Sequence, residues 1–260
     1  MPLHELRKHI ADRPLIGTTI LSTAPSIVEI AAMSPFDVLC LDAEHSALTI
    51  EQIETLVRAA DVHNKPTIVR VPEAGHYIGR VLDLGASGVV VPRLETADEV
   101  ADVVQRARFA PSGKRGAGPG RGSQYGYSLA SSDYTARANE SNLVIVQIEN
   151  AAAVNAIDEI VSVPELDAVV IGPFDLALSM GVAPFGQEHT KAIEKVIESA
   201  TERGVATGAF CFSERDVDFY SRRGSRVLLI GGDLPWISSG VAAEWDMWDR
   251  VKSATSTAVA

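Results

Sequence analysis

Short aliphatic runs alternate along the chain with segments of helical periodicity. Eight runs predict strands that are buried on both faces, because they lack the polar alternation of a half-exposed strand. They span residues 15–21, 38–41, 67–71, 88–91, 143–148, 168–171, 205–210 and 227–230. Between two of them, apolar residues spaced from Ile193 to Ala200 and followed by Gly204 are typical of an amphipathic helix with a glycine at its end. The pattern indicates a repeated strand–helix unit.

The starts of two predicted helices support this order. Thr49 with Gln52, and Thr96 with Glu99, have the spacing of a capping box, and each pair follows a predicted strand. Eight such units in 260 residues predict an α/β protein with a (β/α)₈ barrel, in one domain spanning residues 1–260. A doubly wound open sheet is the alternative, although the glycine fingerprint of nucleotide-binding sheets does not follow the first strand. Two smaller domains are a further alternative for this length.

Composition narrows the function classes. The 23 basic and 34 acidic residues give a net charge of −11, which disfavours nucleic acid and anionic membranes as partners. Cys40 and Cys211 are far apart, so neither a disulfide framework nor a paired-cysteine zinc motif is indicated. No apolar stretch approaches the roughly 20 residues of a membrane span. We therefore expect a cytoplasmic enzyme.

A glycine-rich segment, residues 110–127, interrupts the repeated pattern. Gly118, Gly120 and Gly122 do not have the dinucleotide-binding spacing, and Arg115 stands where a phosphate-binding loop needs Ser or Thr after Lys114. The segment predicts a long loop. It is either a flexible surface loop or an ordered one that borders the active site or a subunit contact.

In a barrel, the loops after the strands carry the chemistry. The polar residues at or just after the ends of the predicted strands are Asp42, Glu44, His45, Arg70, Gln147, Glu149 and Asp175. We therefore expect these side chains to converge at one end of the barrel.

The carboxylates among them suggest a metal site. Gln147 and Glu149 are two residues apart and project to the same face of their strand, and Asp175 follows the next strand. Two carboxylates without Cys or His at ligand spacing favour Mg²⁺ or Mn²⁺. The alternatives are a structural salt bridge from Glu149 to Arg70 and a helix-capping role for Asp175.

His45 and Arg70 are candidate catalytic residues. Asp42 lies three residues before His45, which allows the carboxylate to orient the imidazole as an acid or base, although a solvated histidine or a helix-capping Asp42 are the alternatives. Arg70 ends its strand, where a permanently charged donor suits a carboxylate or enolate oxygen. No lysine ends an aliphatic run, so imine chemistry is disfavoured and a metal would have to polarise the substrate.

Several motifs in order and spacing resemble the HpcH/HpaI family of class II pyruvate aldolases. They are FDVLCLDAEHS, TIVRVP, GASGVVVPRLETADE, PSGKRGAG, VIVQIEN and VIGPFDLALSMG, between about residues 15 and 233. The resemblance implies a barrel in a hexameric assembly, with the C-terminal helix exchanged between subunits. It also implies Glu149 and Asp175 as ligands of a divalent metal (Mg²⁺, Mn²⁺ or Co²⁺), Gln147 beside the metal, Arg70 on the oxo oxygen, and His45 with Asp42 as the acid/base pair.

The resemblance implies an aldolase that makes or cleaves 4-hydroxy-2-oxo acids. The enolate of pyruvate or hydroxypyruvate would attack an aldehyde, and the backbone N–H groups of the turn formed by Gly172, Pro173, Phe174 and Asp175 would hold the donor carboxylate. Phe174 departs from the small residue frequent in the family, which could alter the acceptor pocket. The rival functions are an acyl-CoA thioester lyase of the same superfamily and a non-catalytic binding barrel.

The last helix is predicted to start at Asp233, with Pro235 in its first turn, and to extend to about residue 251. From Ile237 onward, spacings of four, four and three residues place Val241, Trp245 and Trp248 on one face. This face suits either packing on its own barrel or a contact in a homo-oligomer, and the resemblance favours the oligomer.

Overall fold

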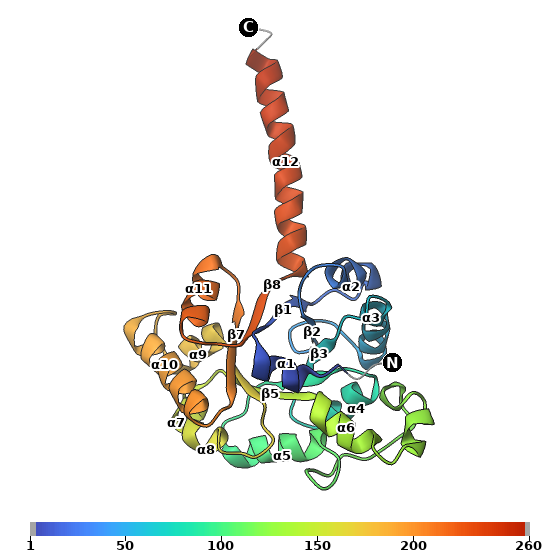
Figure 1. The fold of residues 1–260 in the computed structure, drawn as a ribbon. Helices are drawn as coiled ribbons and strands as arrows, with labels where there is room; N and C mark the ends of the chain where they lie inside the picture. The colour runs from blue at the N-terminus through green and yellow to red at the C-terminus, as the bar shows by residue number, and fades with distance from the viewer. Residues whose placement is uncertain (1–3, 258–260) are drawn as a thin grey trace.

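A closed barrel of eight parallel strands, paired in sequence order, forms the centre of the molecule (Figure 1). The computed structural model describes the backbone of residues 4–257 and the side chains of residues 4–252. The strands are β1 (Leu15–Ile20), β2 (Val38–Asp42), β3 (Thr67–Arg70), β4 (Gly88–Val91), β5 (Leu143–Ile148), β6 (Ala168–Ile171), β7 (Ala206–Cys211) and β8 (Val227–Gly232). All eight predicted strands are confirmed. The pairing of β1 with β8 closes the barrel and excludes the open-sheet alternative.

Helices connect the strands and surround the barrel (Figure 1). They are α1 (Leu6–Asp12), α2 (Pro25–Ala32), α3 (Ile50–Val62), α4 (Tyr77–Asp83), α5 (Ala97–Ala107), α6 (Tyr134–Ser141), α7 (Ala151–Asn155), α8 (Ile157–Ile160), α9 (Pro173–Met180), α10 (Gln187–Glu202), α11 (Glu214–Arg222) and α12 (Asp233–Thr257), with short 3₁₀ helices at Arg121–Ser123 and Tyr127–Ala130. The predicted capping boxes at Thr49 and Thr96 are confirmed at the starts of α3 and α5. Each satisfies backbone groups that the first turn of a helix leaves unpaired.

Alternation along the strands divides the apolar core into two layers. On β2, Val38 and Cys40 belong to the cluster inside the barrel, whereas Leu39 and Leu41 belong to the larger cluster between strands and helices. Because successive side chains point to opposite faces, the inward series on β2 continues to Asp42. The inward series on β3 and β5 likewise end in polar residues, Arg70 and Gln147.

The glycine-rich segment is ordered, and it lies away from the carboxyl ends of the strands. It follows α5 and precedes β5, so it starts and ends at the amino-terminal end of the barrel. Arg115 forms an ion pair of 2.7 Å with Asp83 at the end of α4, and Arg121 forms one with Asp61 near the end of α3. The expectation that this loop borders the active site of its own chain is therefore wrong. Whether it lies in a subunit contact stays a prediction.

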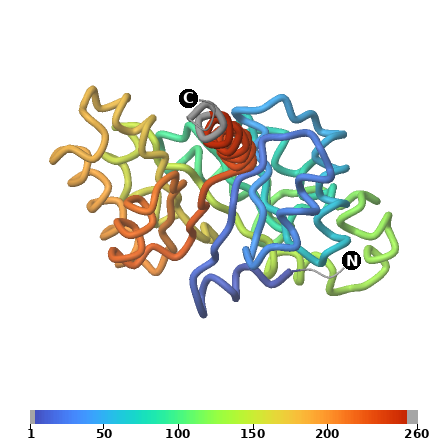
Figure 2. The backbone as a smooth tube through the Cα atoms, turned by 90° about the horizontal axis from the view of Figure 1, so that it is seen from above, coloured from blue at the N-terminus to red at the C-terminus, as the bar shows by residue number. Residues whose placement is uncertain are grey.

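The C-terminal helix α12 projects from the barrel at the carboxyl end of β8 (Figures 1 and 2). At its root, the buried carboxylate of Asp233 accepts the backbone N–H groups of Leu21 at 3.0 Å and Ser22 at 2.7 Å, and so joins the helix to the end of β1. The tryptophan face does not pack on its own barrel, because Val241, Trp245 and other residues on it are more than half exposed. Among the residues described, no helix combines the length and apolar character needed to cross a membrane.

Candidate active site

Three inward strand positions form a layer of polar residues above the apolar interior. Asp42 ends β2 and pairs in register with Arg70, which ends β3. The Arg70 guanidinium donates from Nε to Asp42 Oδ1 at 3.0 Å and from a terminal nitrogen to Gln147 Oε1 on β5 at 3.3 Å. It also lies 4.5 Å from the centre of the Phe210 ring. This layer fixes the guanidinium from three sides.

Buried charge is balanced within this layer. Burial lowers the pKa of Arg70, but the hydrogen bond and charge of Asp42 outweigh it, so the net shift is upward. The guanidinium therefore stays charged next to the cavity. Asp42 is 1% exposed, and its remaining contacts are to the backbone N–H groups of Glu44 at 3.0 Å and His45 at 3.2 Å.

Glu149 continues the same layer into the cavity. Gln147 donates from Nε2 to Glu149 Oε2, and the backbone N–H of Arg93 donates to Glu149 Oε1 at 2.7 Å. Burial raises the pKa of Glu149, and the charges of Glu44 and Asp175 add to the rise, although the two hydrogen bonds oppose it. The ionised Glu149 carboxylate is therefore destabilised by burial and by two neighbouring negative charges.

Gly172 allows this close packing. A Cβ atom at this position would lie 2.8 Å from Gln147 Nε2, which is closer than real Cβ contacts, and 3.0 Å from Glu149 Cβ, which is at the tight limit of such contacts. The absence of a side chain lets the end of β6 approach β5, and α9 then begins at Pro173. The N–H groups of Phe174 and Asp175 lie in the first turn of α9 and have no intrahelical acceptor.

The side chains meet in a cavity of about 330 Å³ at the carboxyl ends of the strands. It is lined by Glu44, His45, Arg93, Glu95, Glu149, Asn150 and Asp175. The predicted convergence is therefore present for His45, Glu149 and Asp175, with Asp42, Arg70 and Gln147 in the layer behind them. Phe174 is 55% exposed beside the cavity, and its ring centre lies 6.2 Å from that of Phe212, which follows β7.

The imidazole of His45 lies next to Glu44 rather than Asp42. Its Nε2 is 3.7 Å from Glu44 Oε2, and the side chain is 52% exposed. Glu44 is 2% exposed and also faces Arg93 Nε at 2.9 Å and a terminal nitrogen of Arg70 at 3.5 Å. Its Oε2 accepts no hydrogen bond from the described residues. Asp42 thus reaches His45 through the backbone, and Glu44 is the carboxylate beside its ring.

The donor set fits a hard divalent cation with few protein ligands. No group of three His, Cys, Asp or Glu side chains in the described part of the chain is gathered for a metal. Mg²⁺, however, is commonly held by one or two carboxylates, with water and substrate as the other ligands. Glu149 and Asp175 supply two carboxylates to one cavity, where burial and the charges of Glu44 and Asp175 raise the pKa of Glu149, so that a cation beside it would be favourable.

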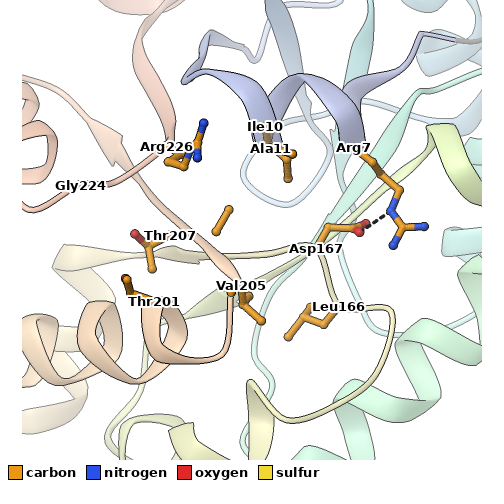
Figure 3. A pocket seen from close by; sticks show the side chains of 12 residues that line it. Arg7, Ile10, Ala11, Leu166, Asp167, Thr201, Val205, Thr207, Gly224 and Arg226 are labelled. Carbon is orange, nitrogen blue, oxygen red and sulfur yellow. Dashed lines mark ion pairs between the residues drawn. The ribbon is translucent and has the colours of Figure 1, made fainter.

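A second and larger cavity, of about 550 Å³, lies at the opposite end of the barrel (Figure 3). Helix α1 borders it, and Arg7 forms a 2.6 Å ion pair with Asp167 at its edge. The Asp167 carboxylate also forms an ion pair with the fully buried Arg108, in which a terminal guanidinium nitrogen lies 2.6 Å from Oδ2. These charges pair with one another, and none of the predicted site residues lies there. The cavity at the carboxyl ends is therefore the better candidate.

Arg93 is a site residue that the sequence pattern did not predict. Its backbone has φ of 61°, which is uncommon for a residue with a side chain. That conformation accompanies the contact of its N–H with Glu149 and of its guanidinium with Glu44. The available signal was its position, since Arg93 follows a strand as the selected residues do.

Comparison with known proteins agrees with the geometry. Residues 16–238 match the sequence model of a family described as HpcH/HpaI aldolase/citrate lyase. The chain is 34% identical over 256 residues to a 4-hydroxy-2-oxovalerate aldolase of Novosphingobium aromaticivorans, with 95% of each chain covered. It is 35% identical over 196 residues to a 2-keto-3-deoxy-L-rhamnonate aldolase of Escherichia coli O17:K52:H18 (strain UMN026 / ExPEC), covering 74% of this chain and 72% of the relative.

A solved structure extends the similarity to the whole fold. The crystal structure of an HpcH/HpaI aldolase from Desulfitobacterium hafniense DCB-2 superposes with a TM-score of 0.85 at 29% identity. The alignment covers 95% of this chain and 96% of that one.

Proposed function

Because the chain belongs to the HpcH/HpaI aldolase/citrate lyase family, we propose that it is a metal-dependent class II aldolase. It makes or cleaves 4-hydroxy-2-oxo acids, with a 2-oxo acid as donor and an aldehyde as acceptor. The observation that carries the proposal is the contact chain from Arg70 through Gln147 to Glu149, which ends in the cavity shared with Asp175 and His45. This chain of contacts supports the proposal because it links the charged Arg70 to Glu149, one of the two carboxylates that we propose as metal ligands.

The donor site is built for an anionic 2-oxo acid. The free N–H groups of Phe174 and Asp175 at the start of α9 are suited to a carboxylate, because unpaired amides and the helix dipole both favour negative charge there. Arg70 balances the charge of the donor's enolate. The small donors that fit this description are pyruvate and hydroxypyruvate.

Glu149 and Asp175 would hold a divalent ion, Mg²⁺, Mn²⁺ or Co²⁺, and Gln147 would keep Glu149 oriented toward it. When bound, such an ion acts as a Lewis acid on the carbonyl group of the donor. The cation would also relieve the crowding of Glu149 by Glu44 and Asp175.

Proton transfer falls to His45. Its half-exposed ring reaches the cavity, and imidazole is the side chain that most often acts as a general acid or base in enzymes. It would give and take the proton of the hydroxyl group that forms from the aldehyde carbonyl. Asp42 fixes the backbone of His45, and Glu44 lies beside its ring.

The charge of the cavity disfavours the acyl-CoA lyase reaction. Its lining contains the carboxylates of Glu44, Glu95, Glu149 and Asp175 but only the guanidinium of Arg93 as a fixed cation. The phosphates of CoA would need a basic surface at this mouth. A non-catalytic barrel would not need a carboxylate whose pKa is raised by burial and by two neighbouring carboxylates.

The test is release of pyruvate from a 4-hydroxy-2-oxo acid before and after chelation, alongside an acyl-CoA substrate. Activity should disappear in excess chelator and return with Mg²⁺, Mn²⁺ or Co²⁺. Full activity in chelator together with borohydride trapping of a lysine adduct would contradict the metal-dependent reaction. Turnover of the acyl-CoA substrate alone would favour the rival lyase.

We also propose a homo-oligomer, a hexamer with α12 exchanged between subunits. The support is the uncovered face of α12, which carries Trp245 and Trp248 with 65% and 54% of their surfaces exposed. Aromatic surface of this kind is enriched at protein interfaces. A cytoplasmic location is part of the same proposal, since Cys40 and Cys211 are free thiols.

A further inference from the structure

Glu44 is a buried carboxylate whose two oxygens face different partners at the mouth of the barrel. Its side chain is 2% exposed, and Oε1 lies 2.9 Å from Nε of Arg93. Oε2 accepts no hydrogen bond from the described residues, although Nε2 of His45 lies 3.7 Å away and a terminal nitrogen of Arg70 lies 3.5 Å away. A buried acceptor without a donor costs free energy. A hydrogen bond to Oε2 would therefore be favourable.

Of the two donors near Oε2, His45 is the one that is free to move. The guanidinium of Arg70 is held by hydrogen bonds to Asp42 and Gln147. The His45 side chain is 52% exposed, and its ring nitrogens form no hydrogen bond within the described chain. A modest rotation of the imidazole can bring Nε2 into hydrogen-bond range of Oε2 and leave the buried layer unchanged.

Asp42 does not compete for the imidazole, because both of its oxygens are occupied. Oδ1 accepts Nε of Arg70 at 3.0 Å and the backbone N–H groups of Glu44 at 3.0 Å and His45 at 3.2 Å. Oδ2 accepts a terminal nitrogen of the same guanidinium. Glu44 is therefore the carboxylate available to the ring. A neutral imidazole that donates from Nε2 has its lone pair on Nδ1, so Nδ1 is left to exchange a proton with a ligand.

We propose that Glu44 is a positioning residue for proton transfer, which holds the Nε2 side of the His45 ring and leaves Nδ1 for the substrate hydroxyl. The inference rests on the proposed function for its consequence in catalysis. In cleavage, the hydroxyl O–H bond breaks, an Nδ1–H bond forms, and the electron pair of the broken carbon–carbon bond passes to the enolate. The ring is then an imidazolium, whose charge the Glu44 carboxylate balances. Addition is the reverse.

Glu44→Gln keeps the shape of the side chain and removes its charge. At saturating Mn²⁺, we expect kcat for addition of pyruvate to acetaldehyde to fall about tenfold, as loss of the carboxylate partner of a histidine does. Exchange of the C3 protons of pyruvate should stay within about threefold, because enolate formation does not use His45. In the double variant with His45→Ala, Glu44→Gln should cause no further loss, since residues that act as one unit are not additive.

The matched control is Glu73→Gln. Glu73 Oε1 also lies 3.7 Å from a histidine nitrogen, Nδ1 of His76, but both side chains are exposed and neither lines the cavity. Its kcat should stay within about twofold of the unsubstituted enzyme. If Glu44→Gln does not fold, as judged by thermal unfolding, Glu44→Asp replaces it in the same measurements, because this variant keeps the charge and withdraws it from the ring.

A fall in kcat with preserved exchange and no additivity supports the inference. An unchanged kcat, equal losses in addition and exchange, or a further loss in the double variant overturns it. If the unsubstituted protein converts no 2-oxo acid with any aldehyde, the proposed function fails, and NMR of the imidazole nitrogens still decides the role of Glu44. A His45 ring that is protonated on Nε2 and whose signals move in Glu44→Gln supports the contact. A ring protonated on Nδ1 alone, or signals that do not move, overturns it.

Discussion

Arg70 and His45 differ in how firmly the protein holds them. The Arg70 side chain is 10% exposed and has Asp42 and Gln147 as partners, whereas the His45 side chain is 52% exposed. A substitution at His45 should therefore remove the proposed proton-transfer group with little effect on packing. A substitution at Arg70 also leaves the buried Asp42 carboxylate without its main cation.

The two residues should separate the half-reactions of the proposed aldolase. His45→Ala should slow aldol addition by about 10²-fold and leave Mn²⁺ affinity near normal, because a general base is lost while the metal ligands remain. Arg70→Ala should already slow exchange of the C3 protons of pyruvate with deuterated water. The measurement is exchange by NMR in each variant. Unchanged exchange in Arg70→Ala would contradict its role at the enolate.

Glu149→Gln should raise the stability of the metal-free protein while abolishing Mn²⁺ binding. Burial and two carboxylates raise the pKa of Glu149, so the ionised group opposes folding at neutral pH. Relief of about 1 kcal/mol raises Tm by about 2–4 °C in a chain of this size. The penalty grows as pH rises from the ordinary carboxyl pKa through the raised one, and it is absent below both.

The measurement for this variant is Tm across pH in the presence of chelator. The Tm advantage of Glu149→Gln should be largest at neutral pH and vanish in acid. Glu188→Gln, at an exposed carboxylate in the first turn of α10, is the control and should show no such gain. A lower Tm for Glu149→Gln at neutral pH would show that the carboxylate stabilises the fold.

Much of the site could be predicted from the alternation of side chains between the two faces of each strand. Gln147 and Glu149 share a face, and every second residue on β5 lies inside the barrel, so the pair had to reach its mouth. Side-chain orientation could not be predicted in the same way. Whether Asp42 turns to the ring of His45 or to Arg70 depends on which partner lies closer across the sheet, and the register places Arg70 there.

At the scale of elements, the strands could be predicted because parallel strands that are buried on both faces appear in the sequence as unbroken aliphatic runs. The glycine-rich segment was harder, since its composition indicates a loop without saying which surface it covers. Its position is set by ion pairs such as Arg115 with Asp83, between residues far apart in sequence. Such pairs have no local signal.

The face of α12 gives a prediction about assembly. Trp245→Ala should convert the oligomer into smaller species, because it removes a large exposed aromatic surface from the proposed contact. Light scattering at micromolar concentration measures the masses, and Ser239→Ala on an exposed position of the same helix is the control. A monomer mass for the unsubstituted protein would refute the assembly.

Truncation is a second test of α12, but its position matters. Asp233 accepts hydrogen bonds from Leu21 and Ser22, so deletion from Asp233 onward also removes a link between β1 and β8. Trp236 stacks on Phe36 with ring centres 6.5 Å apart. A chain ending after Ile237 keeps both contacts and removes only the projecting part. Its mass should fall in the same way as that of Trp245→Ala.

At the scale of the whole molecule, stability and chemistry are concentrated at opposite ends of the barrel. Arg108 is fully buried at the amino-terminal end, and it donates to the carbonyl of Asn142 at 2.7 Å and to the carboxylate of Asp167 at 2.6 Å. The candidate active-site cavity lies at the other end. A substitution at Arg108 should therefore lower the stability of the fold without changing the rate of the reaction.

Arg108→Met should lower the free energy of unfolding by about 3–5 kcal/mol, as breaking a buried ion pair usually does. The kcat of the folded fraction should be unchanged. Urea unfolding at fixed protein concentration and steady-state kinetics measure the two quantities. Arg106→Met, which removes an exposed pair with Asp102 on the same helix, should cost less than about 1 kcal/mol. A large fall in kcat for Arg108→Met would mean that the two ends are coupled.

In the proposed oligomer, the projecting helix would make the stability of each subunit depend on its neighbours. At 25 residues, α12 is about 38 Å long, and its side chains from Leu234 to Lys252 are exposed. Helices of this kind gain most of their stability from tertiary packing, so an isolated chain would leave α12 marginal. When neighbours cover it, mass action ties the melting temperature to protein concentration. Dilution alone would then loosen both the helix and, in the proposed oligomer, the contacts between subunits.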